Sequence, residues 1–598
     1  MKLWICVIVL SAFVALGICE NITISVFGPQ VRNIPMAFGD FNSDELTDVF
    51  VRTGNDRTVQ IMLANLEEPI LQKSDKHKCD FKNQVTSIVP GDFDGDVFMD
   101  ILVTTIVIDV PKPYTEVFIL WGGDTSLNCT NASTPILKIK DQPLAMDYNQ
   151  DMIIDLFGAD ENGTRFFWIF NTDRSAPEKI KMEEPVGQLS PMESIRIPHS
   201  NGFLDLDGDH YSDLFITTDK YFEVWNGKKG GFEFGHTIPL PPQDVDYYIG
   251  QSIHADVELL GKMDLIVPTC ILVNSACTKS KIMVYSDNKW QDLGVDFTDS
   301  SKTQWEFAKE EQPYLNTVTM HGGDFNMDGY PDLLVTLKSS STQQTRALLL
   351  ENVSCNNCGN VNRTFKIKWD ALEPFNNMES IAAVFYDFFQ NGILDVILVL
   401  RDKSKVDKHE MAAFKNSDYD ANFIKVMVLT GRVNDKFPVS QGPISLSRTK
   451  KTYGTNLPGP SITYNTYTQD GLPRTAMGAQ LPQSAHLSMN LPFTIFGLGR
   501  TPNFIEMVTI GLNGLKKECP QIIPNSQMVV IPKPMDDPSR WKAQLFVTPS
   551  KIILLSAAAL LATCGLITLI IVALYWKERR EDKFEKLQEA HRFHFDAM

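Results

Sequence analysis

The sequence predicts an all-β fold: a seven-bladed β-propeller, then a membrane-proximal β-domain, one transmembrane helix and a short cytosolic tail. The main observation is an acidic motif that recurs seven times at intervals of about 58 residues, each copy followed by a β-branched apolar segment. Four short strands fit each interval, and a closed ring protects strand edges that an open array exposes. An open solenoid is less favoured, because no distinct capping repeats are visible.

Length and composition limit the class of protein before any motif is considered. The chain has 598 residues and a formal net charge of −18, from 73 acidic and 55 basic residues. This length predicts several domains. The acidic balance argues against a broad basic surface for nucleic acid and favours cation binding or simple solubility.

Residues 1–19 have the features of a secretory signal peptide. Met1 and Lys2 precede an apolar run over residues 3–14, and the small residues Gly17 and Cys19 stand at plausible cleavage offsets. We therefore expect the mature chain to begin near Glu20.

The acidic motif has the form Asp-x-(Asp/Asn)-x-Asp-x-x-x-Asp. Its five intact copies are Asp40/Asn42/Asp44/Asp48, Asp92/Asp94/Asp96/Asp100, Asp147/Asn149/Asp151/Asp155, Asp205/Asp207/Asp209/Asp213 and Asp324/Asn326/Asp328/Asp332. Two eroded copies begin at Asp256 and Asp387, where Leu260 and Phe389 replace an oxygen-bearing residue, so we expect no ion in either.

Oxygen ligands at alternate positions of a tight loop suit Ca²⁺, which accepts six to eight oxygens in flexible geometry. Asp and Asn also favour turns without any metal, but five copies in one ligand register favour binding. We predict about five structural Ca²⁺ ions, held by the twenty residues of the intact copies. Only Gly329 supplies glycine at the sixth position, and we expect a strained backbone there in the other four copies.

Residues 431–549 lack the acidic motif and predict an antiparallel β-domain. The expected strands are 463–468, 486–489, 493–496, 507–510, 528–531 and 543–547. Prolines at 520, 524, 532, 534, 538 and 549 suggest either a stiff extended approach to the membrane or edge-strand positions.

The run 552–576 is long and apolar enough to cross a bilayer. Lys577, Arg579 and Arg580 follow it, so the positive-inside bias predicts a single-pass type I membrane protein with an extracellular N-terminal part. Six Asn-x-Ser/Thr sequons all precede the span, at Asn21, Asn128, Asn131, Asn162, Asn352 and Asn362. The predicted parts are the signal peptide 1–19, propeller 20–430, β-domain 431–549, transmembrane helix 550–576 and tail 577–598.

Seven cysteines remain in the predicted ectodomain. Cys355 and Cys358 could form a redox or zinc site, but a local disulfide or separate pairings are favoured because a second CxxC pair is absent. Cys270 with Cys277 and Cys79 with Cys129 are further plausible bridges, which would leave Cys519 free, although sequence cannot fix connectivity.

Three stretches carry a resemblance to known families. Gly39 to Asn42, Gly91 to Asp96 and Gly323 to Gly329 resemble the FG-GAP repeats of integrin α-subunit propellers. Further stretches look like the linkin/T-cell immunomodulatory protein family: 457–460, 483–486, 496–500, 523–527 and 589–598.

This resemblance covers essentially the whole chain and implies a cell-surface adhesion or recognition protein. In integrin propellers the cation loops lie opposite the ligand face, which implies a stabilising role for them here. The family is also linked to modulation of T-cell responses, and to RuvB-like AAA ATPases and tubulin as cytosolic partners of the tail.

We expect no enzymatic activity. The chain lacks a Gly-x-Ser-x-Gly elbow and a Walker A loop, and Ala413 stands where the second histidine of a zincin helix beginning at His409 is required. The favoured hypothesis is a receptor that binds an extracellular protein partner through a calcium-stabilised propeller, and no feature points to nucleic acid. The alternative is an immunomodulatory ligand-type ectodomain, released by shedding, that acts on a receptor of another cell.

Overall fold

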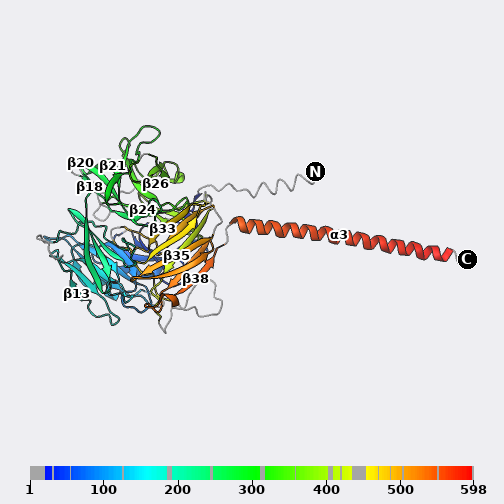
Figure 1. Cartoon of the computed structure of the whole chain (residues 1–598), viewed down its shortest axis with the longest axis horizontal. Coiled ribbons are helices and arrows are strands. Elements are labelled where there is room, and N and C mark those ends of the chain that lie inside the picture. The colour runs from blue at the N-terminus through cyan, green and yellow to red at the C-terminus, as the bar shows by residue number, and fades with distance from the viewer. Residues whose placement is uncertain are drawn as a thin grey trace. The chain divides into compact units, whose positions relative to one another are not determined.

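The computed structural model describes residues 20–29, 32–53, 55–123, 127–184, 192–242, 247–309, 317–356, 358–401, 409–417, 421–433, 453–468, 471–484, 487–500, 504–548 and 551–595. The predicted signal peptide lies outside these residues. The chain divides into two compact units, Met1–Val547 and Thr548–Met598. The first unit is almost entirely β, and the second is one helix (Figure 1).

Seven antiparallel sheets come from the repeat region, one for each acidic loop within the described residues. The first four sheets contain β2 (Asn33–Gly39), β3 (Asp48–Thr53), β4 (Thr58–Ala64) and β5 (Leu71–Asp80); β6 (Gln84–Gly91), β7 (Asp100–Val107), β8 (Tyr114–Leu120) and β9 (Leu137–Ile139); β10 (Leu144–Met146), β11 (Asp155–Ala159), β12 (Arg165–Ile169) and β13 (Glu178–Lys181); and β14 (Gly202–Leu204), β15 (Asp213–Thr217), β16 (Tyr221–Lys228) and β17 (Gly231–Pro239).

The remaining three sheets of the repeat region have the same plan. They contain β18 (Tyr247–Ile249), β19 (Ile253–Ala255), β20 (Asp264–Val273), β21 (Ala276–Ser286) and β22 (Lys289–Asp292); β23 (Trp305–Phe307), β24 (Met320–Gly323), β25 (Asp332–Ser339), β26 (Thr345–Ser354) and β27 (Arg363–Lys368); and β28 (Ser380–Tyr386), β29 (Asp395–Arg401) and β30 (His409–Lys415), completed by β1 (Glu20–Asn21). Short helices α2 (Thr23–Phe27), η1 (Cys129–Ser133) and η2 (Glu373–Phe375) lie in the connections.

Neighbouring sheets share their cores in chain order. One cluster joins the first two sheets to the last, and five others join each remaining pair of neighbours. The ring closes where β1 pairs with β30, with Glu20 opposite Lys415. The predicted mostly-β fold is confirmed, because β-branched and aliphatic residues of each strand bury against the next sheet.

The β-domain is a sandwich of two four-stranded sheets around one core. One sheet has β33 (Pro473–Ala479), β32 (Ser461–Tyr467), β35 (Ile505–Leu512) and β36 (Leu515–Ile522) in spatial order; the other has β34 (Thr494–Gly499), β31 (Asn422–Val428), β37 (Ser526–Ile531) and β38 (Lys542–Val547). The short helix η3 (Pro538–Arg540) precedes β38.

The structure corrects three expectations for this domain. Strand β31 lies before the predicted boundary at residues 430/431 but pairs with β34 and β37, so the β-domain starts at Asn422. The β31–β37 pairing is parallel, so the domain is not purely antiparallel. The expected strand 486–489 is absent over its described residues, because Leu487 and Met489 have left-handed backbones, with φ of 52° and 42°.

The prolines do not form an extended stalk. Pro520 lies in β36, an edge strand, where a missing N–H breaks no ladder. Pro538 begins η3, and Pro549 lies outside the described residues.

The sequence left the cysteine pairings undecided, and the structure contains three disulfides, Cys79–Cys129, Cys270–Cys277 and Cys355–Cys358. Cys519 is a free, buried thiol. The Cys355/Cys358 pair therefore has no thiolates to offer to zinc.

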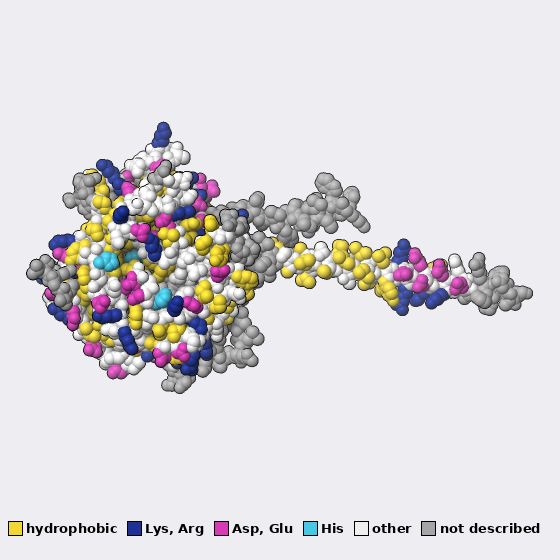
Figure 2. All heavy atoms as spheres, viewed as in Figure 1, with side chains coloured by type: hydrophobic (Ala, Val, Ile, Leu, Met, Phe, Trp, Pro, Cys, Tyr) yellow, Lys and Arg dark blue, Asp and Glu magenta, His cyan; other side chains and the backbone are white. Residues whose placement is uncertain are grey.

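The second unit is α3 (Lys551–Phe595), which begins in the apolar run and continues into the charged tail. Residues 555–589 satisfy the length and hydropathy of a membrane-crossing helix, which indicates a single-pass membrane protein. Figure 2 shows its apolar segment followed by a segment of mixed charge.

Candidate cation-binding loops and an adjoining cavity

Each acidic loop joins an inner strand of its sheet to the next strand outward. The ninth-position aspartate is the first residue of that second strand in all seven copies, at Asp48, Asp100, Asp155, Asp213, Asp264, Asp332 and Asp395. The motif therefore marks the same turn in every sheet.

The ninth-position carboxylate, at the start of the second strand, accepts hydrogen bonds from the acidic loop and from the end of the third strand. Asp213 Oδ2 accepts a hydrogen bond from the Leu206 amide at 2.8 Å, and Oδ1 accepts one from Gly227 at the end of the third strand, also at 2.8 Å. Equivalent pairs occur at five other copies, at Asp48, Asp100, Asp155, Asp332 and Asp395. Sequence analysis assigned these residues only a ligand role, yet they also hold the sheet in register.

The first-position carboxylate caps the loop itself. Asp92 accepts hydrogen bonds from the amides of Asp96 at 3.1 Å and Val97 at 3.0 Å. The sixth position is left-handed throughout the seven copies, at Glu45, Val97, Met152, His210, Gly261, Gly329 and Gly392. The predicted strain at four non-glycine positions is confirmed, whereas the eroded copies carry an unstrained glycine that sequence analysis overlooked.

Burial makes these loops unfavourable places for bare negative charge. Burial, with a nearby Asp44 carboxylate, raises the pKa of Asp40 to about 8. Burial and neighbouring aspartates likewise raise the pKa values of Asp92, Asp147 and Asp324 to about 7. A bound cation would relieve this cost, so the residues present fit a structural Ca²⁺.

The five intact loops differ at the third position, which is aspartate in two loops and asparagine in three. Carboxylate oxygens converge within 4.8 Å of one another in two of them, Asp92/Asp94/Asp96 and Asp205/Asp207/Asp209. In these two loops the predicted ligand set is therefore already brought together at its first, third and fifth positions.

In the other three intact loops the third-position asparagine takes part in local hydrogen bonds, and its role as a metal ligand stays a prediction. In each, the third-position asparagine donates its amide N–H to the fifth-position carboxylate: Asn42 to Asp44 at 3.0 Å, Asn149 to Asp151 at 2.9 Å, and Asn326 to Asp328 at 3.2 Å. The physical reason is that an amide N–H and a carboxylate satisfy each other without any cation.

The asparagine oxygens of these three loops are also engaged locally. The Oδ1 atoms of Asn42, Asn149 and Asn326 accept hydrogen bonds from the backbone amides two residues later, over 3.3, 3.2 and 2.9 Å. Asn326 donates in addition to Glu351 Oε1 at 3.2 Å, which fixes it further. These side chains would have to rotate before they and the fifth-position carboxylates could present oxygens to a common metal.

Two loops already contain a cation from the protein. In the Asp92 loop, Arg174 Nε lies 2.5 Å from Asp94 Oδ2, and Nη2 lies 3.0 Å from Asp96 Oδ2. In the eroded Asp387 loop, the buried ammonium of Lys425 lies 3.6 Å from Asp387 Oδ2 and over the Phe493 ring.

Lys425 belongs to β31, so this cation is supplied by the β-domain. The same domain reaches two further loops: the Gly497 amide donates to Asp324 Oδ2 at 2.8 Å, and the Met477 amide donates to Asp256 Oδ2 at 3.1 Å. Arg474 also donates to the Asp328 carbonyl. Sequence analysis missed Arg174 and Lys425; the only signal was a lone lysine within the apolar segment 423–428.

The β-domain therefore covers much of the face that carries the acidic loops. Met152 and Leu259, from two of those loops, are part of the β-domain core. The loop that begins at Asp205 keeps Asp207 and Asp209 exposed and contains no Lys or Arg ion pair among the described residues. It is the most accessible of the five candidates.

Five of the six predicted glycosylation asparagines are accessible. Asn21, Asn128, Asn162 and Asn362 are exposed and Asn131 is half-buried. Asn352 is a correction: it is 2% exposed in β26, and its Nδ2 donates to the Val257 carbonyl at 3.1 Å. A glycan attached to that nitrogen would break this bond and has no space.

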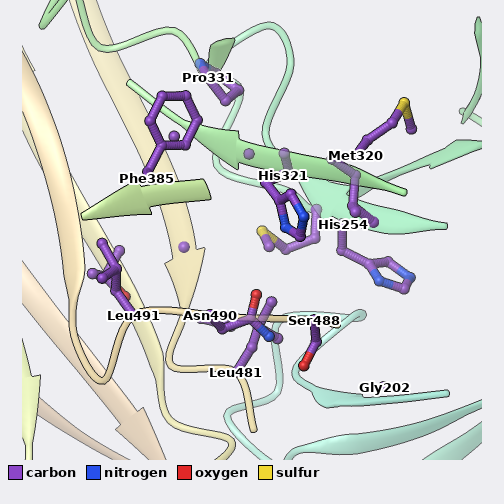
Figure 3. A pocket seen from close by; sticks show the side chains of 18 of the residues that line it. Gly202, His254, Met320, His321, Pro331, Phe385, Leu481, Ser488, Asn490 and Leu491 are labelled. Carbon is purple, nitrogen blue, oxygen red and sulfur yellow. The ribbon is translucent and has the colours of Figure 1, made fainter. Parts of the chain in front are cut away.

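A cavity of about 250 Å³ lies where the inner strands meet the β-domain segment 481–496. Figure 3 shows His254 and His321 on adjacent strands facing Ser488 and Asn490 of that segment. Burial lowers the pKa of both histidines to about 4, so both imidazoles are neutral at physiological pH. The walls combine neutral polar groups and apolar side chains with Asp256 and Asp324, the first residues of two acidic loops.

Comparison with known proteins gives consistent matches along the chain. Residues 40–103 match the FG-GAP-like repeat, and residues 452–546 match the model described as ITFG1, C2 domain. T-cell immunomodulatory protein of Homo sapiens is 38% identical over 97% of this chain and 94% of its own length. Protein linkin of Caenorhabditis elegans is 26% identical over 95% of this chain and 96% of its own.

Proposed function

The chain belongs to the T-cell immunomodulatory protein family, and we propose that it is a cell-surface adhesion or recognition protein that binds an extracellular protein partner. In this proposal it is not an enzyme. It is a type I membrane protein, with α3 crossing the bilayer and the sheets outside the cell.

The observation that carries this proposal is the difference between the two faces of the ring of sheets. The acidic face is largely covered by the chain's own β-domain. The opposite face carries the turns between second and third strands and the connections between sheets. Large apolar side chains are exposed in those segments, at Ile24, Ile108, Ile197, Leu272, Val273 and Met378. Exposed apolar groups near polar loops are typical of protein interaction surfaces.

Calcium would act on this surface indirectly, by holding the sheets in shape. We propose that ions occupy the intact loops, with the Asp205 loop as the clearest site because its carboxylates converge and remain accessible. A cation there neutralises carboxylates whose charged form is disfavoured by burial, as at Asp213.

The test is an adhesion assay with cells that display the full chain. We expect these cells to bind one another, or a second cell type, in calcium and to separate in chelator. The double substitution Ile108→Asp and Met378→Asp should abolish binding. Leu66→Asp is the matched control, because Leu66 is equally exposed but lies in the β4–β5 turn on the acidic side. Equal losses in both variants, or no binding to any cell, would contradict the proposal.

The name of the mammalian relatives favours a second candidate, an immunomodulatory ligand released from the membrane. It predicts that the purified full chain is inactive toward T cells until a fragment ending before α3 is released. In either case the proposed cytosolic partners of the tail are RuvB-like AAA ATPases and tubulin. Co-precipitation with α3 truncated after Trp576 tests that docking, and unchanged recovery of both partners would exclude it.

A further inference from the structure

The β-domain has one strongly apolar end. Strand registers place the end of β32, the start of β33, the start of β35 and the end of β36 together at this end of the first sheet. In the second sheet, Asn422, Gly499, Ser526 and Val547 share one end. The short links β34–β35 and β36–β37 join these two ends, so they form one surface of the domain.

Large exposed apolar side chains gather at this surface. They are Tyr467, Leu472, Phe504, Ile523, Leu545, Phe546 and Val547, which we call the apolar end. Leu472 and Phe504 are 63% and 62% exposed. Single exposed apolar side chains are normal on a protein surface, whereas a group of them marks an interaction site. Phe504 lies beside the β32 terminus, because Thr466 Oγ1 donates to its carbonyl at 3.4 Å.

The other end of the β-domain has a different environment. There the β35–β36 turn rests on the repeat sheets: the Gly514 amide donates to the His210 carbonyl at 3.0 Å. The apolar end also touches the repeats at one corner, where the Gly499 amide donates to the Met327 carbonyl at 2.8 Å and Arg474 donates to the Asp328 carbonyl. The large apolar side chains of this end nevertheless remain exposed among the described residues.

The chain leaves the apolar end for a membrane helix. Strand β38 ends at Val547 and α3 begins at Lys551. Four residue steps span at most about 14 Å in a fully extended chain. The polar headgroup region of a bilayer is itself roughly 5 to 8 Å deep on each side. The apolar end therefore cannot lie far from the lipid surface once α3 crosses the membrane.

We propose that the apolar end of the β-domain inserts its exposed side chains into the interfacial region of the bilayer that α3 crosses. The occupant of this surface is lipid, because the chain itself brings lipid within reach and interfacial burial removes apolar area from water. The inference rests on α3 being a membrane span, as proposed above.

The experiment uses the full chain in lipid nanodiscs. A Cys564→Ser background removes the exposed thiol of α3, and the other free thiol among the described residues, Cys519, is buried. An environment-sensitive dye is attached to Leu472→Cys, and to Lys516→Cys as the matched control. Lys516 is exposed in the same domain but lies at the opposite end, paired with Gly511.

Nitroxide-labelled lipids should quench the dye at position 472 by about twofold and shift its emission to the blue, as expected for interfacial insertion. The dye at position 516 should be unaffected. Adding Phe504→Asp should reduce the quenching at 472. If the dye at position 472 is not quenched in chains that have entered the nanodisc, lipid insertion is wrong but the membrane anchor stands. If dyes on two chains contact each other, the apolar end binds a second copy of the chain instead. Failure of the chain to enter nanodiscs would overturn the membrane anchor as well.

Discussion

The loops that begin at Asp205 and Asp387 follow the same backbone course but balance their charge in different ways. Both have a left-handed sixth residue and a ninth-position aspartate that starts a strand. The Asp205 loop presents exposed carboxylates to solvent, whereas the Asp387 loop is buried against Lys425 of the β-domain. The comparison indicates that the turn of an acidic loop keeps its shape without the third-position oxygen when another domain supplies a positive charge beside it.

Removing the charge supplied by the β-domain should have the largest effect. Lys425→Met leaves Asp387 buried without its cation, and breaking a buried pair in this way costs about 3 to 5 kcal/mol. Thermal unfolding of the full chain in nanodiscs, followed by tryptophan fluorescence, should show a clearly lower Tm. Asp387→Asn in the same chain should restore part of it.

Lys415→Met is the matched control, because Lys415 lies over Phe389 of the same loop but is half-buried rather than fully buried. An unchanged Tm for Lys425→Met would show that the ion pair does not hold this loop.

The Asp205 loop should depend on calcium instead. Asp209→Ala removes its fifth-position oxygen, so the gain in stability that calcium gives should shrink by about 2.7 kcal/mol when calcium is at one hundred times its Kd. In chelator the variant should lose only the hydrogen bond that the Tyr211 amide donates to Asp209 Oδ1 at 2.8 Å. Asp219→Ala, at an exposed position in the β15–β16 turn, is the control. Equal losses with and without calcium would exclude a metal at this loop.

Metal-free protein should also lose stability as the pH rises. The pKa values of Asp40, Asp147 and Asp324 are raised from 3.8 to about 8, 7 and 7, mainly by burial. The folded state therefore binds more protons than the unfolded state between about pH 4 and pH 8. Each such group lowers the unfolding free energy by about 1.4 kcal/mol per pH unit inside its own window. In chelator the Tm should fall as the pH is raised from 5 to 8. Saturating calcium should make the Tm nearly independent of pH over this range. A Tm that rises with pH in chelator would be inconsistent with the burial of these carboxylates.

The smallest effect concerns the two asparagines in and beside β26. Ser354→Ala removes the Asn352 sequon without altering Asn352, and should leave the gel mobility and the Tm unchanged. Asn362→Gln should remove one glycan, seen as faster migration that matches enzymatic deglycosylation. A mobility shift in Ser354→Ala would mean that Asn352 is reached by the glycosylation machinery before β26 is buried.

The mostly-β fold was predictable because each repeat carries its own signal. An aspartate at the start of the second strand forms local hydrogen bonds, such as Leu206 to Asp213, that span only seven residues. Those local contacts leave a fixed spacing that can be recognised in the sequence. The left-handed sixth position follows from the same turn.

The orientation of side chains within a loop was not predictable from the same spacing. Asn149 and Asn326 occupy the position that Asp94 and Asp207 occupy in other copies, and the motif treats all four as oxygen ligands. An amide also carries a donor, and that donor is directed at Asp151 in one loop and at Asp328 in the other. The pattern of residue types therefore located the candidate sites, but it did not reveal how the side chains within each loop are oriented.

Contacts between distant segments were not predictable either. Strand β31 has the same apolar character as a strand of the repeats, so its place in the β-domain depends on partners about a hundred residues later. Arg174 reaches Asp94 across 80 residues, and no spacing rule identifies such a pair. Asn352 matches a sequon, and only its position inside the apolar stretch 347–353 hinted at burial.

The pairing of β1 with β30 sets an order of events during synthesis. Thr23 Oγ1 accepts a hydrogen bond from the Ala413 amide, across 390 residues. At synthesis rates of 5 to 20 residues per second, β30 is synthesised roughly 20 to 80 s after β1. During that interval the first sheets stand without their closing neighbour, and their unpaired strand edges are open to pairing with other chains.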